Sequence, residues 1–325
     1  MKIESSVIKH CLAVLLSAAV AGCGYIAVQT APAKRAATVR SDAAVRADAL
    51  FWQTLHAGDY DNIGAALNAL QAAYLADPAD AVTAAHIGWM HIWRLGESAR
   101  LDDAPAVITD EAVLARRYFQ EAVDLNPHEA RYLGFLAGAT LAEGSIHKDE
   151  KLTRRGYYLL LDGIDAWPEF NLFTGGYVMS PLPSESPQFK QALEWQWRTL
   201  DLCIGEKLNR ADPNFAKFMA QATTEGKKRV CWNSWIAPHN MEGFFLNMGD
   251  MLVKAGNWQS ARQIYANARL STSYGQWKFR DVLGQRIANA QSNVALFNAA
   301  QPGADRTHQR MMSDTPFSCV GCHQE

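Results

Sequence analysis

Two cysteines and a histidine lie close together in the run Cys319-Val320-Gly321-Cys322-His323. Cys-x-x-Cys followed directly by His is the spacing at which haem is attached to protein. The two thiols add to the vinyl groups of haem as thioethers, and the histidine becomes the proximal iron ligand. Because the two cysteines are about one helical turn apart, a helix presents both on one face. We therefore predict that Cys319, Cys322 and His323 hold one covalent haem c, with His323 on the iron.

Two other uses of the same residues stay open at this point. A bare Cys-x-x-Cys pair can carry out thiol–disulfide exchange, and it can also supply half of a zinc site. Haem attachment further requires that the chain is exported, because haem is joined to protein outside the cytoplasm. The beginning of the sequence bears on this condition.

Residues 1–22 have the pattern of a signal peptide. Lys2 and Lys9 precede an apolar run, Cys11–Ala21, which is too short to span a bilayer comfortably. It ends in Val20-Ala21-Gly22-Cys23, which resembles the bacterial lipobox. The resemblance implies that Cys23 is lipidated and becomes the mature N-terminus. A plain signal peptide or an uncleaved anchor is the alternative.

The residue after Cys23 bears on the destination of the protein. Gly24 stands where an inner-membrane retention aspartate would stand, so the resemblance favours the outer membrane, on its periplasmic face or at the cell surface. Acyl chains would then supply the membrane affinity. Residues 23–46 lack large apolar residues after Ile26 and cannot bury enough surface to fold alone, so we expect a flexible lipid-anchored linker.

Composition limits the class of partner, and the remaining cysteines suggest a crosslink. The formal net charge of −2 is not that of a nucleic-acid-binding protein. With Cys11 in the signal peptide, Cys23 lipidated and two cysteines on haem, Cys203 and Cys231 remain. In an oxidising compartment we expect a disulfide between them, with two separate buried thiols as the alternative.

Residues 47–298 show helical periodicity and a recurring spacing of a small residue, a large one four later and a small one three after that. The two clearest copies have a proline five residues further on: Ala115, Phe119, Ala122, Pro127 and Gly156, Leu160, Gly163, Pro168. Weaker copies are Ala66, Leu70, Ala73, Pro78 and, without proline, Ala261, Tyr265, Ala268. The spacing resembles the second helix of the tetratricopeptide (TPR) repeat. The resemblance implies an all-α, TPR-like solenoid of helical hairpins that binds protein partners.

Some stretches interrupt this pattern. Asn171–Pro187 contains Gly175-Gly176 and three prolines, so we expect it not to be helical. Ser186-Pro187 and Asp212-Pro213 each predict a helix start. Extended loops are expected at 100–109 and 144–150. The aromatic-rich stretch 231–241 either fills space between repeats or forms the wall of a pocket.

The tail, residues 299–325, is shorter than a self-contained c-type cytochrome domain and cannot enclose a haem alone. We therefore expect the helical body to supply a wall, near Trp277 and Phe279. Met312 and Met311 are the first candidates for the sixth iron ligand, then His308, and then His239 from the body. Alternatively, the two methionines are apolar fillers.

Together these features resemble a TPR-type bacterial lipoprotein that carries a single c-type cytochrome motif. The resemblance implies a lipid-anchored electron-transfer protein of the cell envelope, which docks a redox partner on its helical body. A second hypothesis is an envelope scaffold lipoprotein that binds protein partners and in which haem is structural or sensory. The enzymatic alternative is a small haem peroxidase, for which no acid–base group is evident in the sequence.

Overall fold

The computed structural model describes residues 24–101, 105–299 and 310–325, and the chain divides into two compact units. The described part of the first unit, residues 24–35, holds a short helical stretch at 24–29. The second unit, residues 36–325, is called the body below. Within the described residues the secondary structure is helical without β-strands, which confirms the predicted all-α class. None of the helices in this part of the chain is long and apolar enough to cross a membrane.

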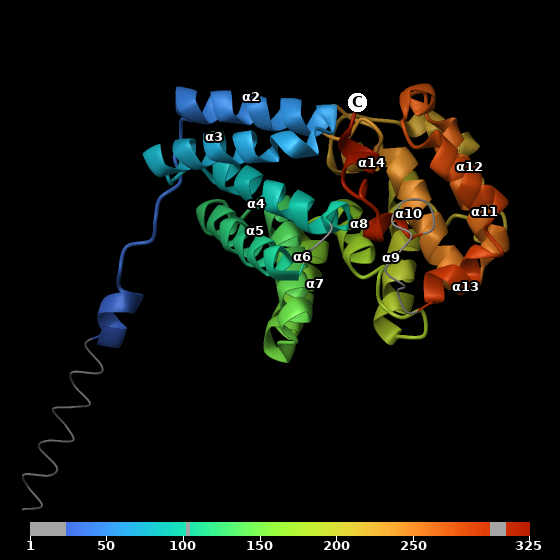
Figure 1. Ribbon diagram of the computed structural model, residues 1–325, viewed down its shortest axis with the longest axis horizontal. Coiled ribbons are helices and arrows are strands. Elements are labelled where there is room, and N and C mark those ends of the chain that lie inside the picture. The colour runs from blue at the N-terminus through green and yellow to red at the C-terminus, as the bar shows by residue number, and fades with distance from the viewer. Residues whose placement is uncertain (1–23, 102–104, 300–309) are drawn as a thin grey trace, which may run out of the picture. The chain divides into compact units, whose positions relative to one another are not determined.

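Figure 1 labels helices of the body, which are numbered in chain order. The α-helices are α2 (Asp42–Ala57), α3 (Ile63–Ala76), α4 (Ala81–Gly96), α5 (Pro105–Leu125), α6 (Ala130–His147), α7 (Glu150–Ala166), α8 (Pro168–Val178), α9 (Pro187–Ile204), α10 (Asn240–Lys254), α11 (Trp258–Asn267), α12 (Arg280–Ala288), α13 (Asn293–Asn298) and α14 (Val320–His323). Short 3-10 helices are η1 (Tyr60–Asn62), η2 (Ser98–Arg100), η3 (Ala216–Gln221), η4 (Lys227–Cys231), η5 (Ala268–Leu270), η6 (Tyr274–Gln276) and η7 (Met312–Asp314).

Local sequence explains several helix ends. The Ser41 and Ser186 hydroxyls accept hydrogen bonds from amides in the first turns of α2 and α9. Pro187 takes the first position of α9, so the helix start predicted at Ser186-Pro187 is confirmed. Gly58 and Gly205 end the same two helices with φ of +65° and +75°, a left-handed backbone that favours glycine.

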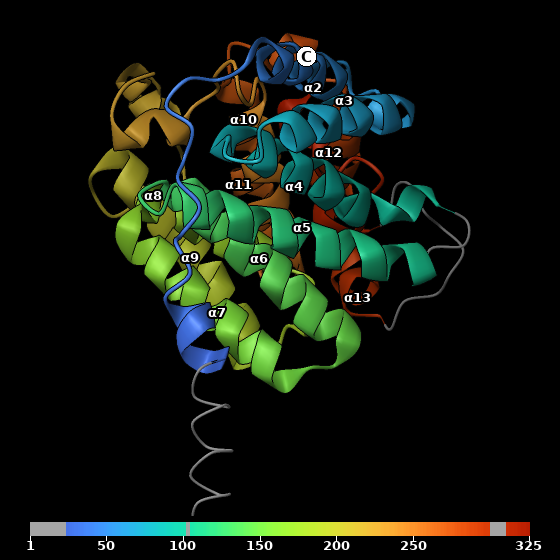
Figure 2. The same ribbon diagram turned by 90° about the vertical axis from the view of Figure 1, so that its left-hand side faces the viewer.

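Helices adjacent in sequence pack as pairs: α2 on α3, α4 on α5, α6 on α7 and α10 on α11 (Figures 1 and 2). Glycines let two of these pairs approach closely. A Cβ at Gly88 of α4 would lie 2.8 Å from the ring of Phe119 of α5. A Cβ at Gly249 of α10 would overlap the ring of Tyr265 of α11. These contacts leave no space for a larger residue at either glycine.

The recurring small–large–small pattern falls inside helices of these pairs. Its large residues lie on α3, α5, α7 and α11 and are at most 1% exposed: Leu70, Phe119, Leu160 and Tyr265. The pattern therefore identifies the faces on which helices meet.

The structure corrects the prediction that residues 171–187 are not helical, because α8 continues to Val178. The helix tolerates Gly175 and Gly176 because side chains of α9 occupy the space a Cβ would need. A Cβ at Gly175 would lie 2.9 Å from the Trp195 ring, and one at Gly176 would overlap the Gln196 amide. Close packing of α8 on α9 thus outweighs the weak helix propensity of glycine.

Two further boundaries differ from the prediction. The loop expected at 144–150 is only a break between α6 and α7, at Lys148 (φ 53°) and Asp149. The helix start predicted at Asp212-Pro213 was also wrong, because no helix begins at Pro213. Instead the side chain of Asn267 accepts from Phe215 N (3.1 Å) and donates to Pro213 O (2.7 Å). These tertiary hydrogen bonds replace those of a helix.

The body begins earlier than residue 47, so the end of the predicted flexible linker belongs to it. Helix α2 starts at Asp42. Before it, the Ala37 amide donates to Ala79 O (2.9 Å), and the Arg40 guanidinium pairs with the Asp80 carboxylate (2.9 Å). This stretch is therefore fixed on the N-terminus of α4.

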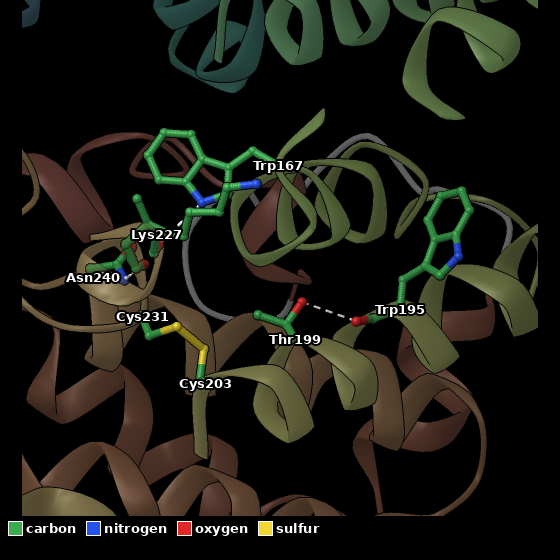
Figure 3. The surroundings of a disulfide bond; sticks show 8 residues. Trp167, Trp195, Thr199, Cys203, Lys227, Cys231 and Asn240 are labelled. Carbon is green, nitrogen blue, oxygen red and sulfur yellow. Dashed lines mark hydrogen bonds between the residues drawn. A yellow bond between two sulfur atoms is a disulfide. The ribbon is translucent and has the colours of Figure 1, made fainter. Parts of the chain in front are cut away.

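Cys203 and Cys231 form a disulfide, as expected from the cysteine assignments (Figure 3). Cys203 lies in the last turn of α9 and Cys231 ends η4. Nearby, the indole of Trp167 donates to Lys227 O (3.1 Å). A long segment without an α-helix, residues 205–239, runs from α9 to α10. The disulfide joins the end of α9 to Cys231 within this segment.

Candidate functional site

Helix α14 carries the Cys-x-x-Cys-His motif (Figure 1). Cys319 immediately precedes the helix, and its carbonyl accepts from the amides of Cys322 (3.2 Å) and His323 (3.3 Å). The turn expected from the spacing is therefore formed. Both thiols are free, with Cys322 buried and Cys319 partly exposed.

The first turn of α14 is bound to Glu97, which lies between α4 and η2, far from α14 in the sequence. The Glu97 carboxylate is fully buried and accepts from the backbone amides of Cys319 (3.1 Å) and Val320 (3.0 Å). Arg100 donates to its other oxygen at 2.7 Å. The N-terminal amides of a helix lack partners within the helix, so the carboxylate satisfies two donors that would otherwise be buried unpaired.

Three other segments of the body bind carbonyls along the motif. The Tyr177 hydroxyl of α8 donates to Ser318 O (3.0 Å), the Trp277 indole to Gly321 O (2.8 Å), and the His239 amide to Cys322 O (3.0 Å). The Phe279 ring stacks on Phe317, with centroids 4.4 Å apart. Trp277 and Phe279 thus lie against the tail, whereas their expected role as a wall for haem stays a prediction. The participation of η2 and α8 was not foreseen.

His323 is oriented by the segment between α9 and α10. Its Nδ1 lies 2.8 Å from Ile236 O, so this nitrogen carries the proton and donates. The ring of Trp89 meets the imidazole edge-on, at 4.8 Å between centroids. Burial lowers the pKa of His323 from 6.5 to about 4, so the imidazole is neutral at physiological pH. Nε2 forms no hydrogen bond with described residues and keeps the lone pair that a metal needs.

The electrostatic environment of the thiols disfavours thiolates. Burial, together with the nearby Glu97 carboxylate, raises the pKa of Cys319 well above its ordinary value. Burial, with a smaller contribution from Glu242, raises the pKa of Cys322 to about 12. Thiol–disulfide exchange needs an accessible thiol with a lowered pKa. The arrangement is therefore poorly suited to the redox-pair alternative.

Each sulfur faces a glycine of the body. A Cβ at Gly96 would lie 3.2 Å from the Cys319 sulfur, and one at Gly243 would overlap the Cys322 sulfur. Any other residue at Gly243 would displace the motif. The two glycines thus mark where the motif seats on α4 and α10.

The candidates for a sixth ligand have different surroundings. Met311 and Met312 are both buried. The Met312 methyl would lie 2.6 Å from a Cβ at Gly321 and 3.3 Å from one at Gly243, so this side chain fills the space between α14 and α10. Its amide donates to the buried Asp250 carboxylate at 2.7 Å. Met312 thus packs as an apolar side chain in this structure, and its role as a ligand stays a prediction.

His239 is buried and its Nδ1 lies 3.1 Å from the Glu242 carboxylate. That carboxylate is also bound by Ser271 (2.7 Å) and Asn233 (2.8 Å), so the imidazole belongs to a polar network beneath the motif. His308 and the lipidation candidate Cys23 lie outside the described residues.

The donor set fits haem c better than it fits the alternatives. It offers two unpaired thiols one turn apart, a glycine where each sulfur meets the body, and a neutral imidazole with Nε2 unbonded. The zinc alternative requires further ligands, and the described residues contain no group of three or more His, Cys, Asp or Glu placed to hold a metal ion.

Comparisons with protein-family models, with curated proteins and with solved structures find no match to this chain. The site is therefore interpreted from its own geometry.

Several residues of the site were not predicted from the sequence. Glu97 follows a helix in an apparently ordinary charged run, and Ile236 contributes only its backbone. Tyr177 lies in a stretch that we did not expect to be helical. No sequence signal identifies Glu97, because its burial and its amide donors depend on the completed fold.

Proposed function

We propose that this chain is a lipid-anchored monohaem c-type cytochrome that transfers electrons in the bacterial envelope. Cys319 and Cys322 would hold the haem covalently and His323 would be the proximal iron ligand. When bound, the haem supplies an iron that accepts and returns one electron. All other features of the proposal concern how the body prepares these three residues.

The observation that carries the proposal is the His323 imidazole with its Nδ1 on Ile236 O and its Nε2 unbonded, next to two free thiols. Histidines that bind metals almost always donate the other ring N–H to a carbonyl or carboxylate, which fixes the tautomer and ring orientation. A chance Cys-x-x-Cys-His sequence on a surface has no reason to acquire this hydrogen bond.

The body supports the motif in three ways. Glu97, Tyr177 and Trp277 hold the backbone of the motif, so that the side chains keep their relative positions. Burial keeps His323 neutral, and therefore able to donate its lone pair. The Trp89 ring packs edge-on against the imidazole and limits its orientation. The surroundings of a bound haem are one of the means by which a protein sets its potential.

The helical hairpins support a docking role for the body. We infer that they form a TPR-like array, because glycines of one helix receive the large side chain of the next at Gly88 and Gly249. An array of this kind presents an extended surface to a protein partner. The lipobox-like sequence ending at Cys23 supports attachment to the envelope, most consistently with the outer membrane.

Production of the full chain in a bacterium that attaches haem to exported proteins tests the proposal. We expect one haem per chain that stays with the polypeptide after denaturation and extraction with acidified organic solvent. Replacement of both Cys319 and Cys322 by serine should remove it, and His323→Gln should change the ligation spectrum. His128→Gln, at an exposed histidine, is the matched control.

Two outcomes would redirect the interpretation. A folded, exported chain without covalent haem would overturn the proposal and leave the envelope-scaffold hypothesis. Rapid turnover of hydrogen peroxide by the haem-loaded protein would instead support the peroxidase alternative.

A further inference from the structure

The segment between α9 and α10, residues 205–239, contributes two of the contacts that hold the motif. Its C-terminal part gives the Ile236 carbonyl to His323 and the His239 amide to Cys322 O. The segment contains no α-helix, so no regular hydrogen-bond ladder fixes these groups in place. Their positions depend on how the segment is tied to the rest of the body.

The carbonyl that orients His323 sits on an exposed turn. Trp235 and Ile236 are 61% and 40% exposed, whereas Trp232, Ala237 and His239 beside them are buried. The turn is closed by the Ser234 amide, which donates to Ala237 O at 3.1 Å. The Trp235 ring packs against Trp52 and His56 of α2, at 4.7 and 5.0 Å between centroids. Because Ile236 itself is partly exposed, the position of its carbonyl depends on these contacts and on the ties that join the turn to α9 and α10.

Hydrogen bonds join the two sides of the turn. The Asn233 side chain accepts from the Met241 amide (2.8 Å), and the Asn240 side chain donates to Val230 O (2.9 Å). The side that precedes the turn carries a covalent tie in addition: Cys231, five residues before Ile236 in the sequence, is bonded to Cys203 in the last turn of α9 (Figure 3). The disulfide thus connects a regular helix to the turn that faces the imidazole.

We propose that the Cys203–Cys231 disulfide is a positioning element for His323, acting through the Ile236 carbonyl. With the disulfide intact, the carbonyl stays where it accepts from Nδ1, and Nε2 stays unprotonated. Without it, the turn moves away from the imidazole and the preference for one tautomer is lost. The role of His323 on iron rests on the proposed function, whereas the effect on its tautomer does not.

Nuclear magnetic resonance of the haem-free full chain tests the proposal directly, because the two ring nitrogens report which one carries the proton. In the wild type we expect the Nδ1–H tautomer to dominate at neutral pH. In the variant with Cys203→Ser and Cys231→Ser we expect a shift toward the Nε2–H form, which free imidazole side chains prefer. An unchanged tautomer in a folded, disulfide-free protein would overturn the proposal.

Reduction of the wild type replaces the double variant if the latter does not fold. Dithiothreitol supplies two electrons and two protons, so that Cys203 and Cys231 become thiols while dithiothreitol closes to its cyclic disulfide. The His323 signals should shift in step with the appearance of the two thiols. Signals that stay at their oxidised positions in the reduced, folded chain would again contradict the inference.

Asn267→Ala is the matched control, because it loosens the same segment at its other end. This change removes the hydrogen bonds to Phe215 N and Pro213 O, far along the chain from Ile236. It should lower stability and leave the His323 tautomer unchanged. A shift equal to that of the disulfide variant would mean that any loosening suffices, and would refute a specific role for the disulfide.

The haem-loaded protein gives an independent measurement. An imidazole that no longer donates from Nδ1 is a weaker electron donor to iron, so the midpoint potential of the disulfide-free protein should be higher than that of the wild type. If no haem is attached to any variant, the proposed function fails while the tautomer result still stands. If haem is attached and both tautomer and potential are unchanged, only the positioning proposal fails.

Discussion

The paired helices α4–α7 and the motif region around α14 are both closely packed, but they are held by contacts of different range. In α4–α7, glycines meet residues of an adjacent helix in the chain, as at Gly88 and Phe119 or Gly156 and Leu141. Around α14 the hydrogen bonds join residues separated by 222 positions (Glu97 to Cys319) and 141 positions (Tyr177 to Ser318). The first region depends on local sequence and the second on the completed fold.

This difference has a consequence for folding and for the site. Helical hairpins with contacts between neighbours can form independently of the rest of the chain. The motif can reach its final arrangement only after η2, α8 and the segment before α10 are in place. We therefore expect changes at the motif to release the tail while the hairpins persist, and changes in the hairpins to lower the stability of the whole body.

Glu97→Ala should have the largest effect, because it removes the acceptor of two buried amides and the partner of Arg100. Unsatisfied buried donors cost about 1–3 kcal/mol each, so we expect a loss of about 3 kcal/mol for docking of the tail. Faster alkylation of Cys319 and Cys322 in the haem-free protein, with the helical circular-dichroism signal retained, would show that the tail is released.

Glu97→Gln separates the charge from the hydrogen bonds. The amide oxygen can still accept from the motif, so the loss should be smaller than for alanine. Equal losses for the two variants would mean that the negative charge, rather than the geometry of acceptance, holds the motif. Global unfolding by Glu97→Ala would break the contrast between the two regions.

Two glycine-to-alanine substitutions compare the two regions, because each adds the same methyl group. Gly88→Ala introduces a methyl 2.8 Å from the buried Phe119 ring, and Gly243→Ala introduces one that overlaps the Cys322 sulfur. Overpacking of this kind costs about 2 kcal/mol. In chemical denaturation we expect Gly88→Ala to lower the main transition. Gly243→Ala should mainly increase alkylation of Cys319 and Cys322.

Gly284→Ala is the control for both substitutions. This glycine lies in α12 and no atom lies within 4 Å of its added Cβ. The variant should be unchanged or stabilised by up to about 1 kcal/mol, since alanine favours helices. If Gly243→Ala shifts the main transition as much as Gly88→Ala does, the tail and the hairpins unfold as one unit.

The same difference in range explains which features could be predicted from the sequence. Helix faces at Leu70, Phe119, Leu160 and Tyr265 follow from spacing alone, because their partners lie in adjacent helices. The disulfide followed from assigning the other cysteines. Glu97, by contrast, has no local signal, since its donors lie at the far end of the chain.

One error has the same origin. Residues 171–178 belong to helix α8 although they contain Gly175 and Gly176, because Trp195 and Gln196 of the next helix pack where side chains would otherwise stand. The spacing that made Met312 and Met311 ligand candidates likewise did not indicate that the Met312 side chain packs on Gly321. Sequence spacing limits how far a side chain can reach and does not determine where it points.

An ionic contact offers a test on the hairpin side, through pH. Burial alone would raise the pKa of Asp80, but hydrogen bonds from Arg40 and Thr83 outweigh it and hold that pKa below its usual range. The folded state therefore binds the proton more weakly than the unfolded state. The stabilisation is present above about pH 4 and is lost as the pH falls through the folded pKa.

Asp80→Asn removes this contribution, which we put at about 1 kcal/mol because Arg40 is partly exposed. Wild type and variant should differ in unfolding free energy at neutral pH and converge as the pH falls below the folded pKa of Asp80. A constant difference over this range would assign the effect to packing or helix capping rather than to charge. Alkylation of Cys319 and Cys322 at neutral pH should be the same in both proteins, if the two regions are independent.

The smallest expected effect isolates one hydrogen bond of the motif. Trp277 and Trp232 are both buried, at 1% and 3% exposure. The Trp277 indole donates to Gly321 O at 2.8 Å, whereas the buried Trp232 indole nitrogen has no hydrogen-bond partner among the described residues. Replacement of each by phenylalanine removes a similar volume, so the cavity terms are comparable. The additional loss at Trp277 should be about 1 kcal/mol and should appear as exposure of the motif thiols. Equal losses at both sites would mean that packing, rather than hydrogen bonding to distant segments, holds the motif in place.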